Sequence, residues 1–340
     1  MKSFASDNYA GVHPAVLNAI GKANAAHARA YGYDEVTAEA EALFKREFGA
    51  SIAVHFVLIG TAAYVLSIKT LATSYEAAIV SQDSHLNNDE CGAPEHLACK
   101  LRPIPPTHGK LRPQDLEPCF INLDEHRVRP KVISISQSTE WGTVYSIAET
   151  RALADFAHKH GCYLHVDGAR IANAAASLNV SLRQLTVDAG VDVLSFGGTK
   201  NGMMCGEAVV FFDGALAKDF KYIRKQNMQL ASKMRFISAQ FVAMLTNELW
   251  RKNAAHANAM AKMLAESIRG VARVKIIESV DANALFVQLP PECVEPLRER
   301  FPFYLWKERE SIARWMTAFD TTPEEIREFA ALVAKVCAAK

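Results

Sequence analysis

One lysine stands at the end of a short apolar run, inside a loop of small residues. The run Val191–Phe196 has the length and composition of a buried strand, and Lys200 follows it after two glycines and a threonine. We expect these glycines to admit a bulky group close to the backbone. A lysine amine among apolar neighbours loses hydration, which lowers its pKa and makes it a candidate nucleophile for a Schiff base. A solvated lysine in a glycine-rich turn is the alternative that this segment leaves open.

A second apolar run, Cys162–Val166, is followed by Asp167 and Arg170, and Lys200 lies 33 positions after Asp167. That interval is long enough for one helix and a return strand. In such a unit the two strands are parallel, and their carboxyl ends lie at the same edge of the sheet. Open α/β sheets bind ligands at this edge. We therefore expect the aspartate, the arginine and the lysine to converge there.

An aspartate that faces a lysine across a pocket admits two interpretations. The first is a plain salt bridge. The second is a site for pyridoxal phosphate, which needs a lysine for its aldehyde and a carboxylate for its ring nitrogen.

The elements that must hold these side chains form an alternating pattern of short strands and helices. Helical patterns cover Thr61–Thr73 and Glu149–His160. The alternation predicts an α/β fold with a mostly parallel seven-stranded sheet and helices on both faces. The loop before the seventh strand is too short for a crossover helix, so we expect that strand to be antiparallel. The expected strands are Ala53–Ile59, Ala77–Ser81, Lys100–Ile104, Lys131–Ser136, Cys162–Val166, Val191–Phe196 and Ala208–Phe212.

The pattern changes after about Gly214, where long helical stretches continue to Ser267. We predict a large cofactor-binding domain over residues 1–245, which includes the N-terminal segment, and a small α+β domain over residues 246–340. The elements expected at the end of the chain are strands near Val274–Ile277, Ala284–Gln288 and Ala313–Ala318, and a helix over Pro323–Ala338.

The composition disfavours several classes of protein. Lys and Arg number 38 against 37 Asp and Glu, which gives no support to a nucleic-acid partner. The seven cysteines form no Cys-x-x-Cys pair, and the N-terminus lacks the apolar core of a signal peptide, so we expect a cytoplasmic protein. The most apolar window, Ala50–Ile68, is interrupted by polar residues and a glycine, which argues against a membrane span.

Two further strand ends carry polar residues. Gly60 and Thr61 begin a helix, where free N–H groups and a hydroxyl can hold a phosphate; an ordinary turn with Thr61 as N-cap is the alternative. His85 is expected at the same edge as Lys200, where its ring could stack on a planar cofactor or move a proton. The acidic residues and the cysteine that follow it match no common ligand spacing, so we expect no metal site.

These segments together resemble the low-specificity L-threonine aldolases, which are fold-type I pyridoxal-phosphate enzymes. The resemblance runs from about Phe4 to the C-terminal helix. Its most specific part is His165-Val166-Asp167-Gly168-Ala169-Arg170 followed by a lysine at this interval. The other parts are Ser6-Asp7-Asn8, Tyr31-Gly32, Gly60-Thr61, His85 with Glu90, Thr199-Lys200 and Arg314.

The resemblance implies a role for each of these residues. Lys200 would carry pyridoxal phosphate as a Schiff base, Asp167 would keep the ring nitrogen protonated, and His85 would stack on the ring. The substrate carboxylate would be held by Ser6 and by two arginines, since a guanidinium fork suits a carboxylate. The expected cofactor-binding residues are Lys200, Gly60, Thr61, His85, Asp167, Arg170, Thr199 and Arg235, and the expected substrate-binding residues are Ser6, Arg170 and Arg314.

The implied activity is the cleavage of L-threonine, L-allo-threonine and related β-hydroxy-α-amino acids to glycine and an aldehyde. A β-eliminating lyase or a transaminase on the same fold, and a non-catalytic protein that binds the cofactor, are the alternatives. The family builds its sites between subunits, so a homodimer or homotetramer is expected. Tyr31 and Lys225 are candidates to reach a neighbouring site.

Two segments depart from the family pattern. After the fourth strand, related aldolases often carry a histidine, whereas this loop reads Ser138-Thr139-Glu140-Trp141-Gly142. If burial raises its pKa, Glu140 could accept the proton of the substrate hydroxyl or orient a water; a salt bridge in the pocket is the alternative. The candidate catalytic residues are therefore Lys200, His85 and Glu140. We also expect Trp141 to line the side that receives the β-substituent. The second departure is a longer interval between the basic residues around Arg235.

Overall fold

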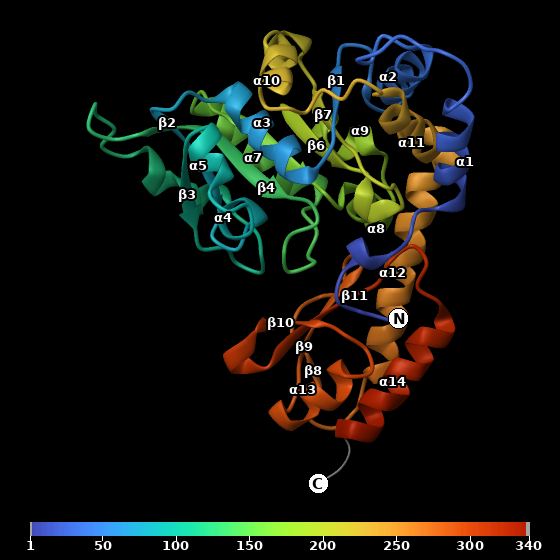
Figure 1. Ribbon diagram of the computed structural model, residues 1–340. Coiled ribbons are helices and arrows are strands. Elements are labelled where there is room, and N and C mark those ends of the chain that lie inside the picture. Colours follow the sequence, from blue (N-terminus) through green and yellow to red (C-terminus); the bar gives the residue numbers. More distant parts are fainter. Residues whose placement is uncertain (1, 338–340) are drawn as a thin grey trace.

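A seven-stranded sheet lies at the centre of the larger lobe in the computed structural model, which describes residues 2–337 (Figure 1). The order of the strands is β1-β7-β6-β5-β4-β2-β3. Strand β7 is antiparallel to both of its neighbours, and the remaining pairs are parallel, so both predictions for this sheet are confirmed. The strands are β1 (Ala53–Val57), β2 (Glu76–Ser81), β3 (Lys100–Ile104), β4 (Arg129–Ser136), β5 (Tyr163–Gly168), β6 (Val193–Gly197) and β7 (Glu207–Phe211).

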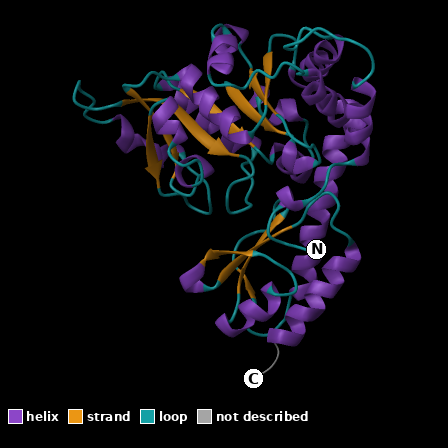
Figure 2. Ribbon diagram, viewed as in Figure 1, coloured by secondary structure: helices purple, strands orange, loops and turns teal. Residues whose placement is uncertain are grey.

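Helices cover both faces of this sheet (Figure 2). Successive side chains of a strand point to opposite faces, so Ile79 packs in one core while Ala78 and Val80 pack in the other. The first core contains side chains of α2 (Glu35–Phe48), α7 (Ile147–Lys159), α8 (Ile171–Leu178) and α11 (Arg235–Leu245). The second contains side chains of α3 (Gly60–Leu71) and α10 (Phe220–Gln226), with α5 (Ala93–Leu97) packed against it.

The smaller lobe is built on a four-stranded antiparallel sheet in the order β10-β11-β9-β8. The expected terminal helix is observed, and Ala338 at its expected end lies outside the described residues. The sequence did not predict β10, because it is short, half exposed and followed by three charged residues. The elements of this lobe are β8 (Lys275–Ile276), β9 (Ala284–Gln288), α13 (Pro291–Arg298), β10 (Tyr304–Lys307), β11 (Ile312–Met316) and α14 (Pro323–Cys337).

Two segments join the lobes. Helix α12 (Leu249–Ile268) begins with Trp250 in the large core and reaches the small core with Leu264. At the other end of the chain, Phe4 packs into the small core, where its ring stacks on Phe329 with the centroids 4.5 Å apart. The N-terminal segment therefore crosses the junction of the lobes before α1 (Pro14–Ala23) begins. The predicted division at residue 245 stays a prediction.

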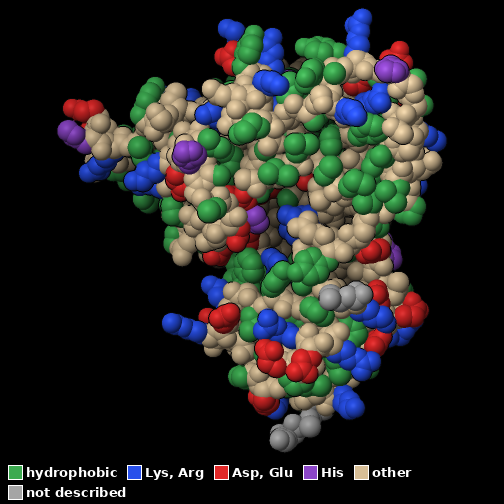
Figure 3. Space-filling view, in the orientation of Figure 1, with side chains coloured by type: hydrophobic (Ala, Val, Ile, Leu, Met, Phe, Trp, Pro, Cys, Tyr) green, Lys and Arg blue, Asp and Glu red, His purple; other side chains and the backbone are tan. Residues whose placement is uncertain are grey.

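Between the lobes the surface is hollowed, and acidic, basic and histidine side chains gather in the hollow (Figure 3). The site described below lies at this junction, because it is lined by residues of both lobes. No helix within residues 2–337 is both long enough and apolar enough to cross a lipid bilayer.

Candidate active site

The carboxyl ends of β5 and β6 bring Asp167 and Lys200 to one cavity. Asp167 is paired in register with Ser195 of β6, and Lys200 follows that strand in the short turn η4 (Thr199–Asn201). Both side chains line a cavity of about 380 Å³, a size typical of small-ligand sites. Both also line an adjoining cavity of about 60 Å³. The chain interval between them thus predicts their meeting correctly, while their chemical roles stay predictions.

The two glycines before Lys200 are needed for backbone packing. A Cβ on Gly197 would lie 2.5 Å from the carbonyl oxygen of Ala169, and a Cβ on Gly198 would overlap the sulfur of Met203. The glycines therefore let β6 and its turn approach the end of β5. Gly197 also lines the larger cavity, and the expectation that these glycines admit a bulky group stays a prediction. This close approach brings the turn that carries Lys200 next to the segment after Asp167.

The Lys200 amine lies in the cleft and is partly removed from solvent, and this burial lowers its pKa. The positive charge of Arg170 lowers it further, whereas the acidic groups nearby, Asp167 among them, act in the opposite direction. A lower pKa leaves more of the amine unprotonated at neutral pH. This is the state that attacks a carbonyl carbon.

Glu207 at the start of β7 holds the turn that carries Lys200. Its carboxylate accepts a hydrogen bond of 2.6 Å from the backbone N–H of Gly198, and it also bonds to Thr199. Burial raises the pKa of Glu207. Sequence reasoning missed this residue, although a glutamate at the head of the apolar run Ala208–Phe212 is a usable signal.

The N-terminus of α3 opens on the larger cavity. Gly60 and Thr61 line it, and the helix has Ile59 as N-cap, which offers no side-chain acceptor to the first-turn N–H groups. Such unpaired donors form an anion site together with the helix dipole. Thr61 is not the N-cap, so that alternative is wrong; its hydroxyl bonds to Glu90 instead. Thr199 lines the same cavity.

His85 lines both cavities, and Glu90 fixes its ring. The Nδ1 atom of His85 pairs with the buried carboxylate of Glu90, which also accepts a bond of 2.5 Å from the hydroxyl of Tyr64. The bond to Glu90 raises the pKa of His85, so the imidazole tends to keep its proton. Sequence reasoning paired His85 with Glu90 and missed Tyr64.

Glu140 lines the smaller cavity together with Lys200 and Arg314. Its Oε1 accepts hydrogen bonds from the hydroxyl of Ser136 at 2.5 Å and from the backbone N–H of His85 at 3.2 Å. Burial raises the pKa of Glu140 to about 7, since these bonds only partly offset the loss of hydration. The group can therefore change its protonation state near neutral pH.

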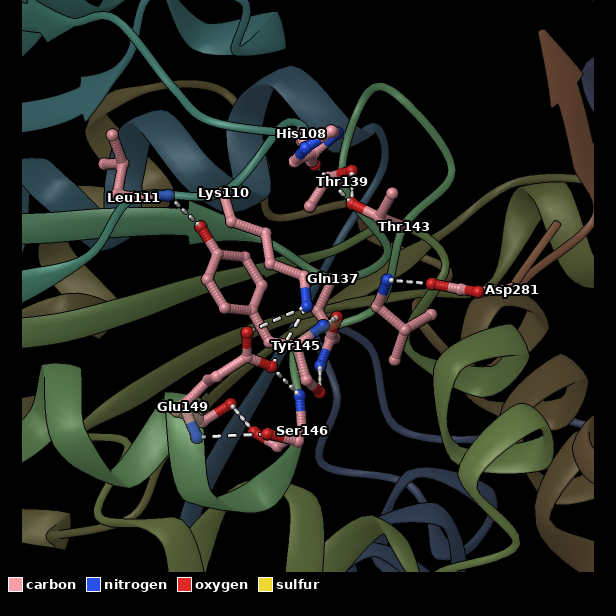
Figure 4. A network of polar contacts seen from close by, with 12 residues as sticks. His108, Lys110, Leu111, Gln137, Thr139, Thr143, Tyr145, Ser146, Glu149 and Asp281 are labelled. Atoms are coloured by element: carbon pink, nitrogen blue, oxygen red, sulfur yellow. Dashed lines mark hydrogen bonds and ion pairs between the residues drawn. The ribbon is translucent and has the colours of Figure 1, made fainter. Parts of the chain in front are cut away.

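The loop that carries this glutamate is held by a network of hydrogen bonds (Figure 4). The side chain of Gln137 bonds to both the N–H and the carbonyl oxygen of Tyr145, at 3.0 and 2.8 Å. The hydroxyls of Thr139 and Thr143 are 2.8 Å apart, and a backbone N–H of the loop donates to Asp281 of the smaller lobe. Hydrogen bonds from both lobes thus hold the loop in place.

Trp141 follows Glu140 but lines neither cavity. Its indole N–H donates to Asp83 at 2.7 Å, and its ring packs on Phe286 and Trp306 with centroid distances of 5.0 and 5.9 Å. Trp306 of β10 lines the smaller cavity instead. The expectation that Trp141 faces the substrate is therefore not met.

Arg170 is bound by Asp7 of the N-terminal segment. Its Nε and Nη2 donate to the two carboxylate oxygens at 2.6 and 2.8 Å, and Asn283 donates to the same carboxylate at 3.1 Å. Burial alone would raise the pKa of Asp7, but the ion pair with Arg170 outweighs it and holds that pKa below its usual value. Asp7 leaves the Nη1 of Arg170 for another acceptor, and Arg170 lines the smaller cavity.

Replacing Asp7 with asparagine is expected to destabilise the protein by roughly 3–5 kcal/mol, because a buried arginine would lose its counter-ion. Urea unfolding followed by circular dichroism measures the change. Glu295→Gln breaks an exposed ion pair with Arg298 and serves as control, with little effect expected. Equal stability of D7N and the wild type would contradict the importance of this pair.

Arg314 of β11 is the second arginine of the smaller cavity. Its Nε is buried and has no hydrogen-bond partner within the described chain. Burial and the charge of Arg170 lower the pKa of Arg314 to about 10. A buried polar group without a partner is rare, and here it fits a site for an anionic ligand.

Two predicted residues lie outside these cavities. The hydroxyl of Ser6 accepts a bond of 3.2 Å from the backbone N–H of Asn8 and caps the short turn η1 (Asp7–Tyr9). Arg235 donates to the carbonyl oxygen of Ala26 and lines a separate cavity at the start of α11. Arg235 therefore lines a different cavity from Lys200 within one chain, and its contact with a phosphate stays a prediction.

The comparison with known proteins agrees with this geometry. The model of the family described as beta-eliminating lyase matches residues 3–290. The low specificity L-threonine aldolase of Pseudomonas aeruginosa is 43% identical over 333 residues, which cover 97% of this chain and 96% of the relative. A second protein of that name, from a Pseudomonas species, is 42% identical over 342 residues and 99% of each chain.

Solved structures of similar fold agree with these sequence comparisons. The threonine aldolase of Leishmania major superposes with a TM-score of 0.94 at 29% identity and covers 99% of this chain and 100% of its own. A putative L-allo-threonine aldolase of Listeria monocytogenes, at 17% identity and a TM-score of 0.72, shares the fold. With relatives this similar over nearly the whole chain, and with the lysine, aspartate and arginines gathered at one cavity, the chain belongs to the beta-eliminating lyase family and, within it, to the pyridoxal-phosphate-dependent low-specificity L-threonine aldolases.

Proposed function

We propose that this protein cleaves L-threonine and related β-hydroxy-α-amino acids to glycine and an aldehyde. One observation carries the proposal: an unpaired buried guanidinium, that of Arg314, shares a cavity with the Lys200 amine and the Glu140 carboxyl. The guanidinium suits the carboxylate of such a substrate and the Glu140 carboxyl suits its β-hydroxyl, next to the lysine that would carry the cofactor. The relatives from two Pseudomonas sources bear the name of this activity.

The larger cavity suits pyridoxal phosphate. Lys200 would attach the aldehyde, Asp167 would pair with the ring nitrogen, and the N-terminus of α3 at Gly60 and Thr61 would receive the phosphate. His85 is available to lie against the ring. Once bound, the cofactor supplies an electron-withdrawing ring that accepts electrons from a bond broken at the substrate Cα.

The two arginines would bind the substrate carboxylate. Arg314 has no competing acceptor, whereas Arg170 is held by Asp7 and has one terminal nitrogen to offer. Fixing the carboxylate orients the substrate, and orientation decides which bond to Cα is broken. Ser6 belongs to the same N-terminal segment as Asp7 and remains a proposed contact.

Glu140 is the better candidate for the base that takes the proton of the β-hydroxyl. A general base works best when its pKa lies near the working pH, and the pKa of Glu140 is about 7. His85 is tied to Glu90, which favours the protonated imidazole and so removes its capacity to accept another proton. We assign the proton transfer to Glu140 and the ring contact to His85.

Product analysis separates this function from its rivals. L-Threonine is expected to give glycine and acetaldehyde in equal amounts, with no ammonia. A β-eliminating lyase or a transaminase would instead give 2-oxobutanoate or another keto acid. A panel of L-threonine, L-allo-threonine, L-serine and L-phenylserine, assayed for aldehyde, keto acid and ammonia, makes the measurement. Keto acid and ammonia as the main products of threonine would end the assignment.

We also propose that the protein is a cytoplasmic homodimer or homotetramer. Large apolar side chains are exposed beside the Lys200 cavity, since Ile59 and Met204 both line it and are about half exposed. Tyr31 is 45% exposed, lies under the amine of Lys225 and lines a cavity to which this chain's own Lys200 does not contribute. A second copy covering these residues would bury them. All seven cysteines are unpaired, which suits a reducing compartment.

A further inference from the structure

Strand β10 presents two aromatic rings to Arg314, and the function proposed above uses neither of them. The centre of the Arg314 guanidinium lies 5.0 Å from the ring centroid of Trp306 and 5.9 Å from that of Tyr304. Both distances are within the range in which a cation is attracted to an aromatic face. The pairing was not expected from the sequence, because β10 was not predicted.

A β-bulge sets the direction of Trp306. Tyr304 pairs with Arg314 and Leu305 with Ala313, but the next pair is Lys307 with Ile312. Trp306 is therefore the bulged residue of β10, and it has no paired residue in β11. Bulges of this kind often occur beside active sites, where they redirect a side chain.

Arg314 has few polar contacts to hold its guanidinium in place. Its guanidinium is mostly buried, its Nε has no hydrogen-bond partner, and no ion pair within residues 2–337 includes it. The charge of Arg170 repels the guanidinium, whereas the carboxylates of Asp7 and Asp89 attract it without forming an ion pair with it. The close contacts that can hold the group in place before substrate arrives are therefore the aromatic faces of Trp306 and Tyr304.

The aromatic pair is itself anchored. Trp306 packs against Trp141, whose indole is held by Asp83, and the hydroxyl of Tyr304 lies 2.7 Å from that of Tyr9. Trp306 also lines the smaller cavity together with Arg314. Trp306 is thus placed at the cavity, whereas Tyr304 lines neither cavity and is 45% exposed.

We propose that Trp306 is a positioning residue, which holds the Arg314 guanidinium where it meets the carboxylate of the amino-acid substrate, with Tyr304 completing the aromatic support. This inference rests on the proposed function only in that the ligand is an α-amino acid. If Trp306 has this role, the affinity for the substrate carboxylate depends on an aromatic residue that does not contact the carboxylate.

The test uses Trp306→Leu, which keeps an apolar side chain but removes the aromatic face, and Trp306→Phe, which restores a ring. Calorimetric titration of the holoenzyme with glycine is expected to show affinity lowered roughly ten-fold in Trp306→Leu and largely restored in Trp306→Phe. Tyr75→Ala is the matched control, because it removes a ring from Arg129 far from the site and should leave glycine affinity unchanged. Wild-type affinity in Trp306→Leu would overturn the proposal.

Two further arms distinguish positioning from a general disturbance of the pocket. Ethanolamine has the amine but no carboxylate, so its affinity should be the same in Trp306→Leu and the wild type. In an Arg314→Gln background, Trp306→Leu should cause no further loss of glycine affinity, because the two residues act through one group. An equal loss for ethanolamine, or a full additive loss in the double variant, would contradict the proposal. Glycine binding is read without any cleavage, so these outcomes are separate from a failure of the proposed function.

Discussion

Replacing Lys200 with alanine is expected to abolish threonine cleavage and to end the covalent attachment of the cofactor. Lys200 is the amine that lines both the larger cavity, where pyridoxal phosphate fits, and the smaller cavity, where the substrate groups converge. The lowered pKa of Lys200 favours the unprotonated amine, which is the nucleophile. The alanine variant has no such amine. Aldehyde release should fall by several orders of magnitude.

Borohydride reduction followed by peptide mass analysis checks the attachment independently of turnover. In the wild type the reduced cofactor should remain on the peptide that contains Lys200, and in the variant no peptide should carry it. Lys131→Ala is a suitable control, because that lysine belongs to β4 of the same sheet, lies near its amino end and donates to the carbonyl oxygen of Gly161. Cleavage at the wild-type rate in the Lys200 variant would refute the assignment of this site.

The large sheet and the meeting of Asp167 with Lys200 could be predicted because both depend on short-range patterns. Apolar runs of strand length mark β5 and β6, and the interval between the two polar residues fixes a parallel pair. The partner of Arg170 could not be predicted in this way. Asp7 lies 163 positions away, and only the packing of Phe4 into the smaller lobe brings it across the junction.

The side of the cavity formed by the smaller lobe was least predictable, since it depends on how the two lobes meet. Trp141 was expected there from its place beside Glu140, yet the docking of β10 places Trp306 at the cavity and Trp141 behind it. Strand β10 gave little signal, because an edge strand with a bulge breaks the two-residue alternation. Glu207 was missed for another reason: a glutamate at the head of an apolar run marks a polar residue at a strand end, but not the hydrogen bond that it accepts from the backbone N–H of Gly198.

Glu140→Gln is expected to lower kcat for L-threonine by roughly 10²–10⁴, the usual contribution of a general base, with a much smaller effect on KM. Glutamine keeps the size of the side chain and an oxygen for the bonds from Ser136 and from the His85 amide, so the loop should retain its structure. Glu149→Gln is the matched control. That residue caps α7 in the same hydrogen-bond network, and glutamine serves at this capping position too. A change in KM alone would mean that Glu140 only positions the substrate.

The pH profile gives this prediction a second, independent measurement. A base acts when it is deprotonated, and burial raises the pKa of Glu140 to about 7, so the carboxylate is the minor form at pH 6 and the major form at pH 8. Wild-type kcat/KM, which reports the groups of the free enzyme, should therefore rise with pH through about 7 and then level off. Glu140→Gln has no group to titrate there, so its residual kcat/KM should lose this rise, whereas Glu149→Gln should keep it. If the acidic limb of the profile persisted in Glu140→Gln, the titrating base would have to be another group, and His85 would be the next residue to test, because its pKa is raised by Glu90 and it lines the same cavity.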